Sequence, residues 1–308
     1  MIEESKSQTT QSITPSTGVV LLAFGKPQYF WMVYNIAYSI KRANKNIKIA
    51  LVSDIGTRAV NYVPELSQFI DLHVELQAQD MYTNKKLDPG KAKVLLYDYL
   101  PFDNNLYLDV DGVCLKDLQP LIDTLVDSGI DYGTSIHGTH TLDHGRDFKQ
   151  MVWSYADEFI NHFNIKEDAM LYGINSSVQF IKKGDVCANL FKVAADQFIN
   201  NPMPLHKLRM KWGGGQPDEL YFNAALCLTE TTPHNIEAVC FQMKRELTFD
   251  QIENSFYVMS YYGGKRFTPM FYIEWLDRLM KSWMQQDGKK HNYLFTRITD
   301  YKYVDGKK

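Results

Sequence analysis

Two aspartates separated by one residue, Asp109 and Asp111, follow the apolar run at 106–108. Such a run is typical of a buried strand, and alternate residues along an extended chain point the same way. If the chain stays extended, both carboxylates can bind one hard divalent cation, which prefers oxygen ligands and keeps coordination places open for phosphate oxygens. The pattern therefore predicts a metal–diphosphate site at the carboxyl end of a sheet strand, which is the chemistry of nucleotide sugars.

A solvated turn is the alternative interpretation, because carboxylates near strand ends are common. The surrounding sequence favours a site: an apolar strand precedes the pair, and the residues Gly-Val-Cys-Leu at 112–115 follow it. Charged side chains rarely lie at the end of a buried strand without a partner.

Other charged residues and glycines have the right types to cleave a sugar–diphosphate bond. Asp218 and Glu219 could stabilise an oxocarbenium-like sugar, as paired carboxylates do in glycosidases. Lys265 could place a point charge on a phosphate, and Gly263 and Gly264 would let backbone N–H groups approach it closely. A tight turn and a solvated lysine are the alternatives for these last three residues.

The surrounding pattern predicts an α/β domain. Apolar runs at 18–25 and 47–54 are typical of strands covered on both faces, and the helical spacing at 29–43 lies between them; this order favours parallel strands. Further expected strands are 131–135 and 177–181, and further expected helices are 92–100 (stopped by Pro101), 186–200, 218–228 (with Pro217 at its start) and 270–284.

Two expected loops could contribute to a site. His137, Gly138, His140 and His144 follow the strand at 131–135 without a zinc-like spacing, so we expect a surface loop near the acceptor. The segment 203–215 ends in three glycines after Trp212, which suits either a lid that stacks on a sugar or a plain exposed loop.

Composition excludes several classes of protein. The chain has 308 residues, 45% of them hydrophobic, and a net charge of −3, which gives no global field for nucleic acid. Four scattered cysteines without a CxxC pair disfavour a zinc site and a disulfide framework. The polar segment 1–17 is not a secretory signal, and no apolar run approaches the ~20 residues that span a bilayer. We expect a cytoplasmic protein; a membrane-surface role for the Trp-containing helix at 270–284 stays open, although a helix covering the core is favoured.

The strand carrying Asp109 and Asp111 resembles the metal-binding strand of GT-A-fold glycosyltransferases, in particular the retaining group of glycogenin and the bacterial lipopolysaccharide galactosyltransferases. Further similarities follow in the right order over about 18–270. Lys93 lies sixteen residues before Asp109, where that group has a basic residue. The other matches are 173–178 with the "F-N-S-G-V" strand, Asp218-Glu219-x-x-x-Asn223 with "D-Q-D-x-L-N", and 261–267 with the "H-Y-x-G-x-x-K-P-W" loop.

This resemblance implies a GT-A-like α/β fold with a mostly parallel central sheet flanked by helices. It implies transfer of a hexose, with retention, from a UDP-sugar, aided by manganese or magnesium bound to Asp109 and Asp111. Asp218 and Glu219 are the implied catalytic residues. The implied donor-binding residues are Ala23, Phe24 and Gly25 at the end of the first strand, Asp54 at the end of the second, and Lys93, Asp109, Asn175, Gly263, Gly264 and Lys265. Gly25 as a turn residue and Asp54 as a helix cap are the alternatives.

Two departures from the family pattern bear on the chemistry. The family's third metal ligand, a histidine, falls at about Ser260, and serine is a poor metal ligand. Water or another residue would complete the shell, or metal dependence would be weak; losing imidazole would also shift preference from manganese toward magnesium. Glu219 replaces the family's Gln and is either a nucleophile or ion-pair stabiliser, or an ordinary helix residue.

The expected division is a disordered leader at 1–17, the GT-A-like domain at 18–270 and a C-terminal helical extension at 271–308. Two other functions stay open. A sugar-1-phosphate nucleotidyltransferase would carry a Gly-rich basic loop after the first strand, for which Gly25-Lys26-Pro27 is sparse. A catalytically degenerate binding module is favoured by Ser260. The acceptor is open among a glycan, a protein, a lipid-linked glycan, a small molecule and a modified nucleic-acid base.

Overall fold

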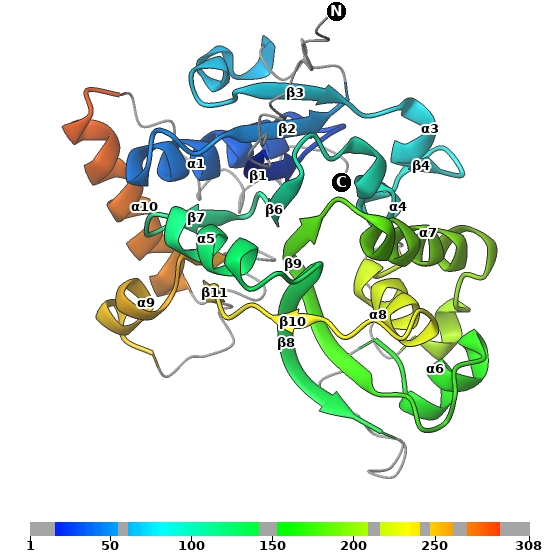
Figure 1. Ribbon diagram of the computed structural model, residues 1–308. Coiled ribbons are helices and arrows are strands. Elements are labelled where there is room, and N and C mark those ends of the chain that lie inside the picture. Colours follow the sequence, from blue (N-terminus) through cyan, green and yellow to red (C-terminus); the bar gives the residue numbers. More distant parts are fainter. Residues whose placement is uncertain are drawn as a thin grey trace, which may run out of the picture.

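The computed structural model describes residues 16–54, 61–141, 153–208, 216–240, 247–260 and 270–289. Its centre is a seven-stranded sheet in the order β10-β8-β9-β6-β1-β2-β3 (Figure 1). The strands are β1 (Thr17–Leu22), β2 (Ile49–Ser53), β3 (Leu72–Glu75), β6 (Asn104–Leu108), β8 (Tyr132–His140), β9 (Leu171–Lys182) and β10 (His234–Asn235).

The sheet is mostly parallel, as the sequence predicted. Strand β1 pairs in parallel with β2 and β6, β2 with β3, and β10 with β8. Only β9 runs the other way, antiparallel to both β6 and β8. The carboxyl ends of β1, β2 and β6 therefore lie along one edge, which is where α/β sheets bind ligands.

Helices cover both faces of the sheet. Strand β1 is accordingly apolar on both sides, since Val19 and Leu21 belong to one buried cluster and Val20 and Leu22 to the other. Figure 1 shows α1 and α10 together, with α7 and α8 beyond β9. The helices are α1 (Pro27–Ala43), α3 (Ala78–Met81), α4 (Pro89–Val94), α5 (Gln119–Asp127), α6 (Ala156–Phe163), α7 (Asp185–Asn200), α8 (Asp218–Leu228), α9 (Phe249–Ser255) and α10 (Met270–Gln286).

The helix α10 packs against the core, as favoured from its sequence. Ile273, Leu276, Met280 and Met284 are buried in the same cluster as α1, and the Tyr38 hydroxyl donates to Asp287 at 2.7 Å. No helix within the described ranges is long and apolar enough to cross a bilayer.

Two small sheets border the central one. Strands β7 (Gly112–Cys114), β11 (Val239–Cys240) and β12 (Val258–Ser260) form one sheet, and β4 (Tyr82–Thr83) pairs with β5 (Lys86–Leu87) in a hairpin. Short 3₁₀ helices lie at Pro64–Gln68, Leu96–Tyr99 and Leu205–Lys207. The β7 strand begins directly after the two aspartates. Its pairing with β12 holds the chain in place on the C-terminal side of Asp111.

Several expected boundaries were wrong, for local reasons. The helix expected at 92–100 is α4 followed by the 3₁₀ helix at Leu96–Tyr99, because Asp88 caps the main-chain N–H of Lys91 at 3.2 Å and starts the helix earlier. Strand β8 runs on to His140, so His137 and His140 lie on a strand and not in a loop. The chain is bent at 110–111 and not extended, with β6 ending at Leu108.

Candidate active site

A buried lysine lies between two carboxylates that come from distant parts of the chain. The Lys93 Nζ, on α4, is 2.9 Å from Asp109 Oδ1 after β6 and 3.4 Å from Asp218 Oδ2 at the start of α8. Lys93 is 9% exposed, and a buried ammonium is costly unless it is paired. Burial alone would lower the pKa of Lys93, but Asp109 and then Asp218 outweigh it and raise that pKa well above its usual value. Lys93 is therefore a fixed positive charge.

Two hydroxyl groups complete this cluster, and the sequence did not single them out. Ser176 Oγ, on β9, donates to Asp218 Oδ2 at 2.5 Å and accepts from Lys93 Nζ at 3.3 Å. The Tyr107 hydroxyl, on β6, donates to Asp109 Oδ1 at 2.6 Å, and Lys93 Nζ lies 5.4 Å from the Tyr107 ring centre. We name Lys93, Tyr107, Asp109, Ser176 and Asp218 the buried charge cluster.

The second aspartate of the pair lacks the partners that the first one has. Asp111 Oδ1 is buried and accepts no hydrogen bond from the described residues. Burial, followed by the charge of Asp109, raises the pKa of Asp111 to about 7, while Lys93 partly offsets this. A buried, unpartnered carboxylate oxygen beside a second carboxylate suits a hard divalent cation, so the residues present fit such an ion.

The described residues supply only part of a coordination shell, since no group of three or more His, Cys, Asp or Glu side chains gathers in these ranges. Strand pairing places Ser260 of β12 opposite Gly112 of β7, next to Asp111 along the chain. The position at which the resemblance puts a third ligand is therefore adjacent to the aspartate pair, and it carries a buried serine.

Glu219 follows Asp218 in the first turn of α8 and is half-buried. Burial, and then the neighbouring Asp218, raises the pKa of Glu219 to about 8, against the opposing effect of Lys93. The Glu219 side chain is thus largely protonated at neutral pH and can donate a hydrogen bond. It offers a neutral group where the resembling family has the amide of Gln.

The two asparagines of the expected motifs have different surroundings. Asn175 is half-buried, and its Oδ1 accepts from the main-chain N–H of Ser177 at 2.9 Å. Asn223 is 1% exposed, and its Oδ1 accepts from the Tyr172 N–H at 3.1 Å, which ties α8 to β9. Asn175 lies next to Ser176 of the buried charge cluster, whereas Asn223 joins two elements of the core.

The expected nucleotide-binding residues meet at the carboxyl ends of β1 and β2. The Gly25 N–H donates to Asp54 Oδ2 at 3.1 Å, and Gly25 has a φ of +78°, which favours glycine. A Cβ there would lie 2.6 Å from a methyl group of Leu87 in the β4–β5 hairpin. Ala23 and Phe24 have core-buried side chains, so these two residues can offer a ligand only their backbone.

The remaining site predictions fall on other parts of the chain. Gly263, Gly264 and Lys265, together with His144 and the glycine-rich end of 203–215, lie outside the described residues. Within the described ranges, the predicted residues Lys93, Asp109, Asp218 and Glu219 come together, and Asp111 and Asn175 are their chain neighbours.

No protein-family model matches this chain, and no curated protein is detectably similar in sequence. Solved structures are similar to it. The apo bifunctional glycosyltransferase WbbM has a TM-score of 0.50 at 13% identity, over 82% of this chain and 47% of that one. The galactosyltransferase LgtC, solved with donor and acceptor sugar analogues, has a TM-score of 0.49 at 16% identity, over 80% of this chain and 87% of that one. The glycosyltransferase GlyE of Streptococcus pneumoniae TIGR4 has a TM-score of 0.46 at 15% identity, over 90% of this chain and 66% of that one.

This chain thus spans about half the length of WbbM. At such identities the similarity establishes the fold and does not identify substrates. Together with the sheet order, it confirms the expected architecture: the chain has the GT-A glycosyltransferase fold.

Proposed function

We propose that this protein is a metal-dependent glycosyltransferase that moves a hexose from a nucleotide diphosphate sugar, a UDP-sugar, to an acceptor with retention. The observation that carries the proposal is the buried charge cluster, which joins the aspartate after β6 to the carboxylate that begins α8 through one lysine. The position of Asp109 supports the proposal, because it follows the carboxyl end of β6, and ligands of α/β sheets bind beyond such strand ends.

The proposed reaction needs opposite charges at its two ends. Breaking a sugar–phosphate bond develops positive charge on the sugar ring and negative charge on the leaving phosphate. A divalent cation bound to Asp109 and Asp111 would neutralise the phosphate. Lys93 supplies a second, fixed positive charge beside Asp109. The Asp218 carboxylate, held by Ser176, faces Lys93 from the other side and can stabilise the developing sugar cation.

Glu219 adds a proton to this arrangement. A third ionised carboxylate beside Asp109 and Asp218 would repel the leaving phosphate, and the raised pKa of about 8 removes that repulsion at neutral pH. The protonated acid can donate a hydrogen bond to a sugar hydroxyl or to the departing oxygen. We therefore assign Asp218 as the cation-stabilising carboxylate and Glu219 as a donor.

A non-catalytic binding module remains the second candidate, because Ser260 occupies the position next to Asp111 where the resembling enzymes have a histidine ligand. This candidate predicts nucleotide binding without turnover. The nucleotidyltransferase alternative is weaker, since the turn after β1 carries a single glycine, Gly25, before α1 begins at Pro27.

The test is hydrolysis of UDP-, GDP- and ADP-hexoses with manganese, with magnesium and with EDTA. We expect slow, metal-dependent cleavage of one UDP-hexose, with the first released sugar keeping the donor's anomeric configuration by NMR. Asp111→Asn should lower this rate at least ~100-fold, because the orphaned carboxylate is lost as a ligand. Asp127→Asn, at the exposed end of α5, is the matched control.

Three results are decisive. Full activity of Asp111→Asn would refute the metal assignment. UDP binding by thermal shift, without cleavage of any donor, would favour the binding module. Absence of both binding and cleavage would reject the nucleotide-sugar proposal.

A further inference from the structure

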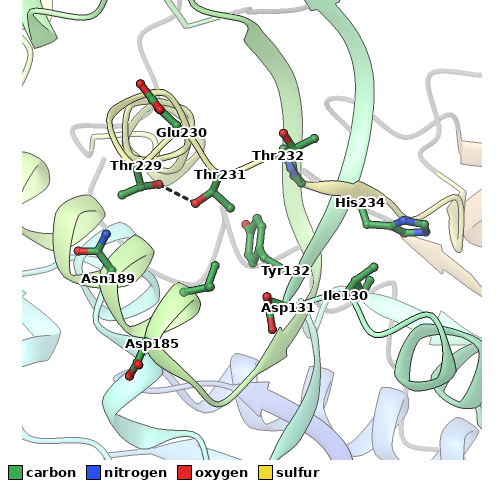
Figure 2. A pocket seen from close by; sticks show the side chains of 12 residues that line it. Ile130, Asp131, Tyr132, Asp185, Asn189, Thr229, Glu230, Thr231, Thr232 and His234 are labelled. Carbon is green, nitrogen blue, oxygen red and sulfur yellow. Dashed lines mark hydrogen bonds between the residues drawn. The ribbon is translucent and has the colours of Figure 1, made fainter.

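A second hollow lies away from the buried charge cluster, at the other end of α8. It has a volume of about 750 Å³ and is bordered by the start of α7, the residues after α8 and the start of β8 (Figure 2). We name it the α7–β10 groove. Helix α8 runs from Asp218 to Leu228, which at 1.5 Å per residue separates the two sites by about 15 Å.

The rim of the groove carries hydrogen-bonding groups that the described protein does not use. Asp185 and Asn189 on α7 line one side of the groove, and Thr232 and His234, at the start of β10, line another (Figure 2). None of these four side chains makes a hydrogen bond or ion pair with another residue in the described ranges. They offer an amide, a carboxylate, a hydroxyl and an imidazole, which both donate and accept.

Apolar groups lie among these polar ones. Ile130 and Val186 line the same space, and Val186 is 43% exposed, whereas the lining residues Tyr132 and Pro233 are themselves buried. Apolar contact surface beside hydrogen-bond donors and acceptors suits a sugar, which has C–H faces and hydroxyl edges.

The charges of the groove nearly cancel. Asp131 pairs with Lys182 at 3.4 Å, and Glu230 pairs with Lys166 at 2.5 Å. Asp185 is then the one lining carboxylate without a cationic partner among the described residues. This charge would repel an anionic ligand, so among oligosaccharides a neutral one fits better than a sulfated or uronic-acid one.

The groove is formed by segments that the fold fixes in place. Cys187 Sγ on α7 donates to the Asp131 carbonyl at 3.1 Å, and the Thr231 N–H donates to the Leu226 carbonyl at 3.0 Å. His234 pairs with Gly133 in the sheet. The rim is therefore held open before any ligand arrives, as in most small-molecule sites.

We propose that the α7–β10 groove binds a neutral oligosaccharide, as a non-catalytic subsite for a distant segment of the acceptor. The link to the acceptor rests on the proposed glycosyltransferase function. Given the length of α8, an acceptor reaching both sites would be a chain of several sugars, so a polymeric glycan is the acceptor class.

The first experiment measures binding to a printed array of neutral, sulfated and uronic-acid oligosaccharides, without donor or metal. We expect binding to neutral glycans of several hexoses. The double variant Asp185→Asn/Asn189→Ala should weaken it at least ~10-fold, because the Asn189 contact is removed and the Asp185 carboxylate, which accepts with two oxygens, becomes an amide that accepts with one. Lys192→Ala, exposed on the same helix and outside the lining, should bind as the wild type does.

Absence of neutral-glycan binding, equal binding of the anionic glycans, or unchanged binding by the double variant would each overturn the proposal. A calorimetric unfolding scan of each variant separates loss of the contact from loss of the fold.

The second experiment separates this inference from the proposed function. Donor hydrolysis reports only on the buried charge cluster, so the double variant should hydrolyse the UDP-hexose at the wild-type rate. When transfer to the bound neutral glycan is measured, the variant should raise KM for the glycan with little change in kcat. Glycan binding without any donor cleavage would refute the proposed function and leave the binding subsite; donor cleavage without glycan binding would do the reverse.

Discussion

The buried charge cluster and the α7–β10 groove treat polar groups in opposite ways. In the cluster, Lys93 is 9% exposed and satisfied by two carboxylates and a hydroxyl. In the groove, exposed side chains such as Asp185 and Asn189 have no partner within the described ranges. Buried polar groups in the cluster must pair with other protein groups, whereas exposed polar groups in the groove can form hydrogen bonds with water. The cluster is therefore preorganised for chemistry, and removing one of its members should lower the free energy of unfolding. Substitutions in the groove should change that free energy little.

The largest expected effect on stability comes from removing the lysine at the centre of the cluster. Lys93→Ala would leave Asp109 and Asp218 facing each other in a buried site, so we expect a loss of about 3 kcal/mol in the free energy of unfolding. Urea unfolding at pH 7 measures it. Lys182→Ala removes the half-exposed partner of Asp131 at the groove and should cost less than about 1 kcal/mol. Equal losses in the two variants would refute the contrast.

The next effect sharpens the role of a single hydroxyl. Ser176→Ala removes the 2.5 Å hydrogen bond to Asp218, so we expect kcat for donor hydrolysis to fall about 10-fold, the value of a hydrogen bond to a charged group. KM for the donor should change little.

Ser177→Ala is the matched control, because among the described residues Ser177 forms hydrogen bonds through its main-chain atoms alone, to Asn175 and Asp109. A similar fall in both serine variants would show that the strand, and not the hydroxyl, is responsible.

A smaller effect concerns pH. The folded-state pKa of Glu219 is about 8, above its unfolded value near 4.5, so the folded state holds a proton that the unfolded state releases. Stability should therefore fall as pH rises from about 4.5 to about 8. Glu219→Gln removes this dependence, and the difference in melting temperature should grow by at least ~2 °C across that range in EDTA. Parallel curves for the two proteins would mean that Glu219 titrates normally.

The smallest expected effect lies in the groove. Asp185→Asn/Asn189→Ala should change the free energy of unfolding by less than about 0.5 kcal/mol, because both side chains are exposed and make no contact that the described structure would lose. Thermal unfolding measures it. A loss of several kcal/mol would show that the groove rim is part of the structural core, in contrast to our interpretation.

The sequence by itself determined much of the framework. The helix expected at 218–228, with Pro217 at its start, is α8 with those bounds, and the apolar run before Asp109 predicted β6 as a buried strand. These features follow from local patterns: a proline starts a helix, and a run buried on both faces forms a central strand. The strand pattern put Asp109 forward as a site residue, whereas Lys93 was put forward only by the family resemblance, which also matched Asp218 and Glu219 to a family motif.

Tertiary structure alone decided which of these residues meet. Ser176 reaches Asp218 across 42 positions of the chain, and Ser260 lies opposite Gly112 because β12 pairs with β7. The bend at 110–111 replaced the extended pair expected there, and the α7–β10 groove gathers residues from 130 to 234. Contacts of this kind depend on strand register and helix packing, which a short sequence window does not contain.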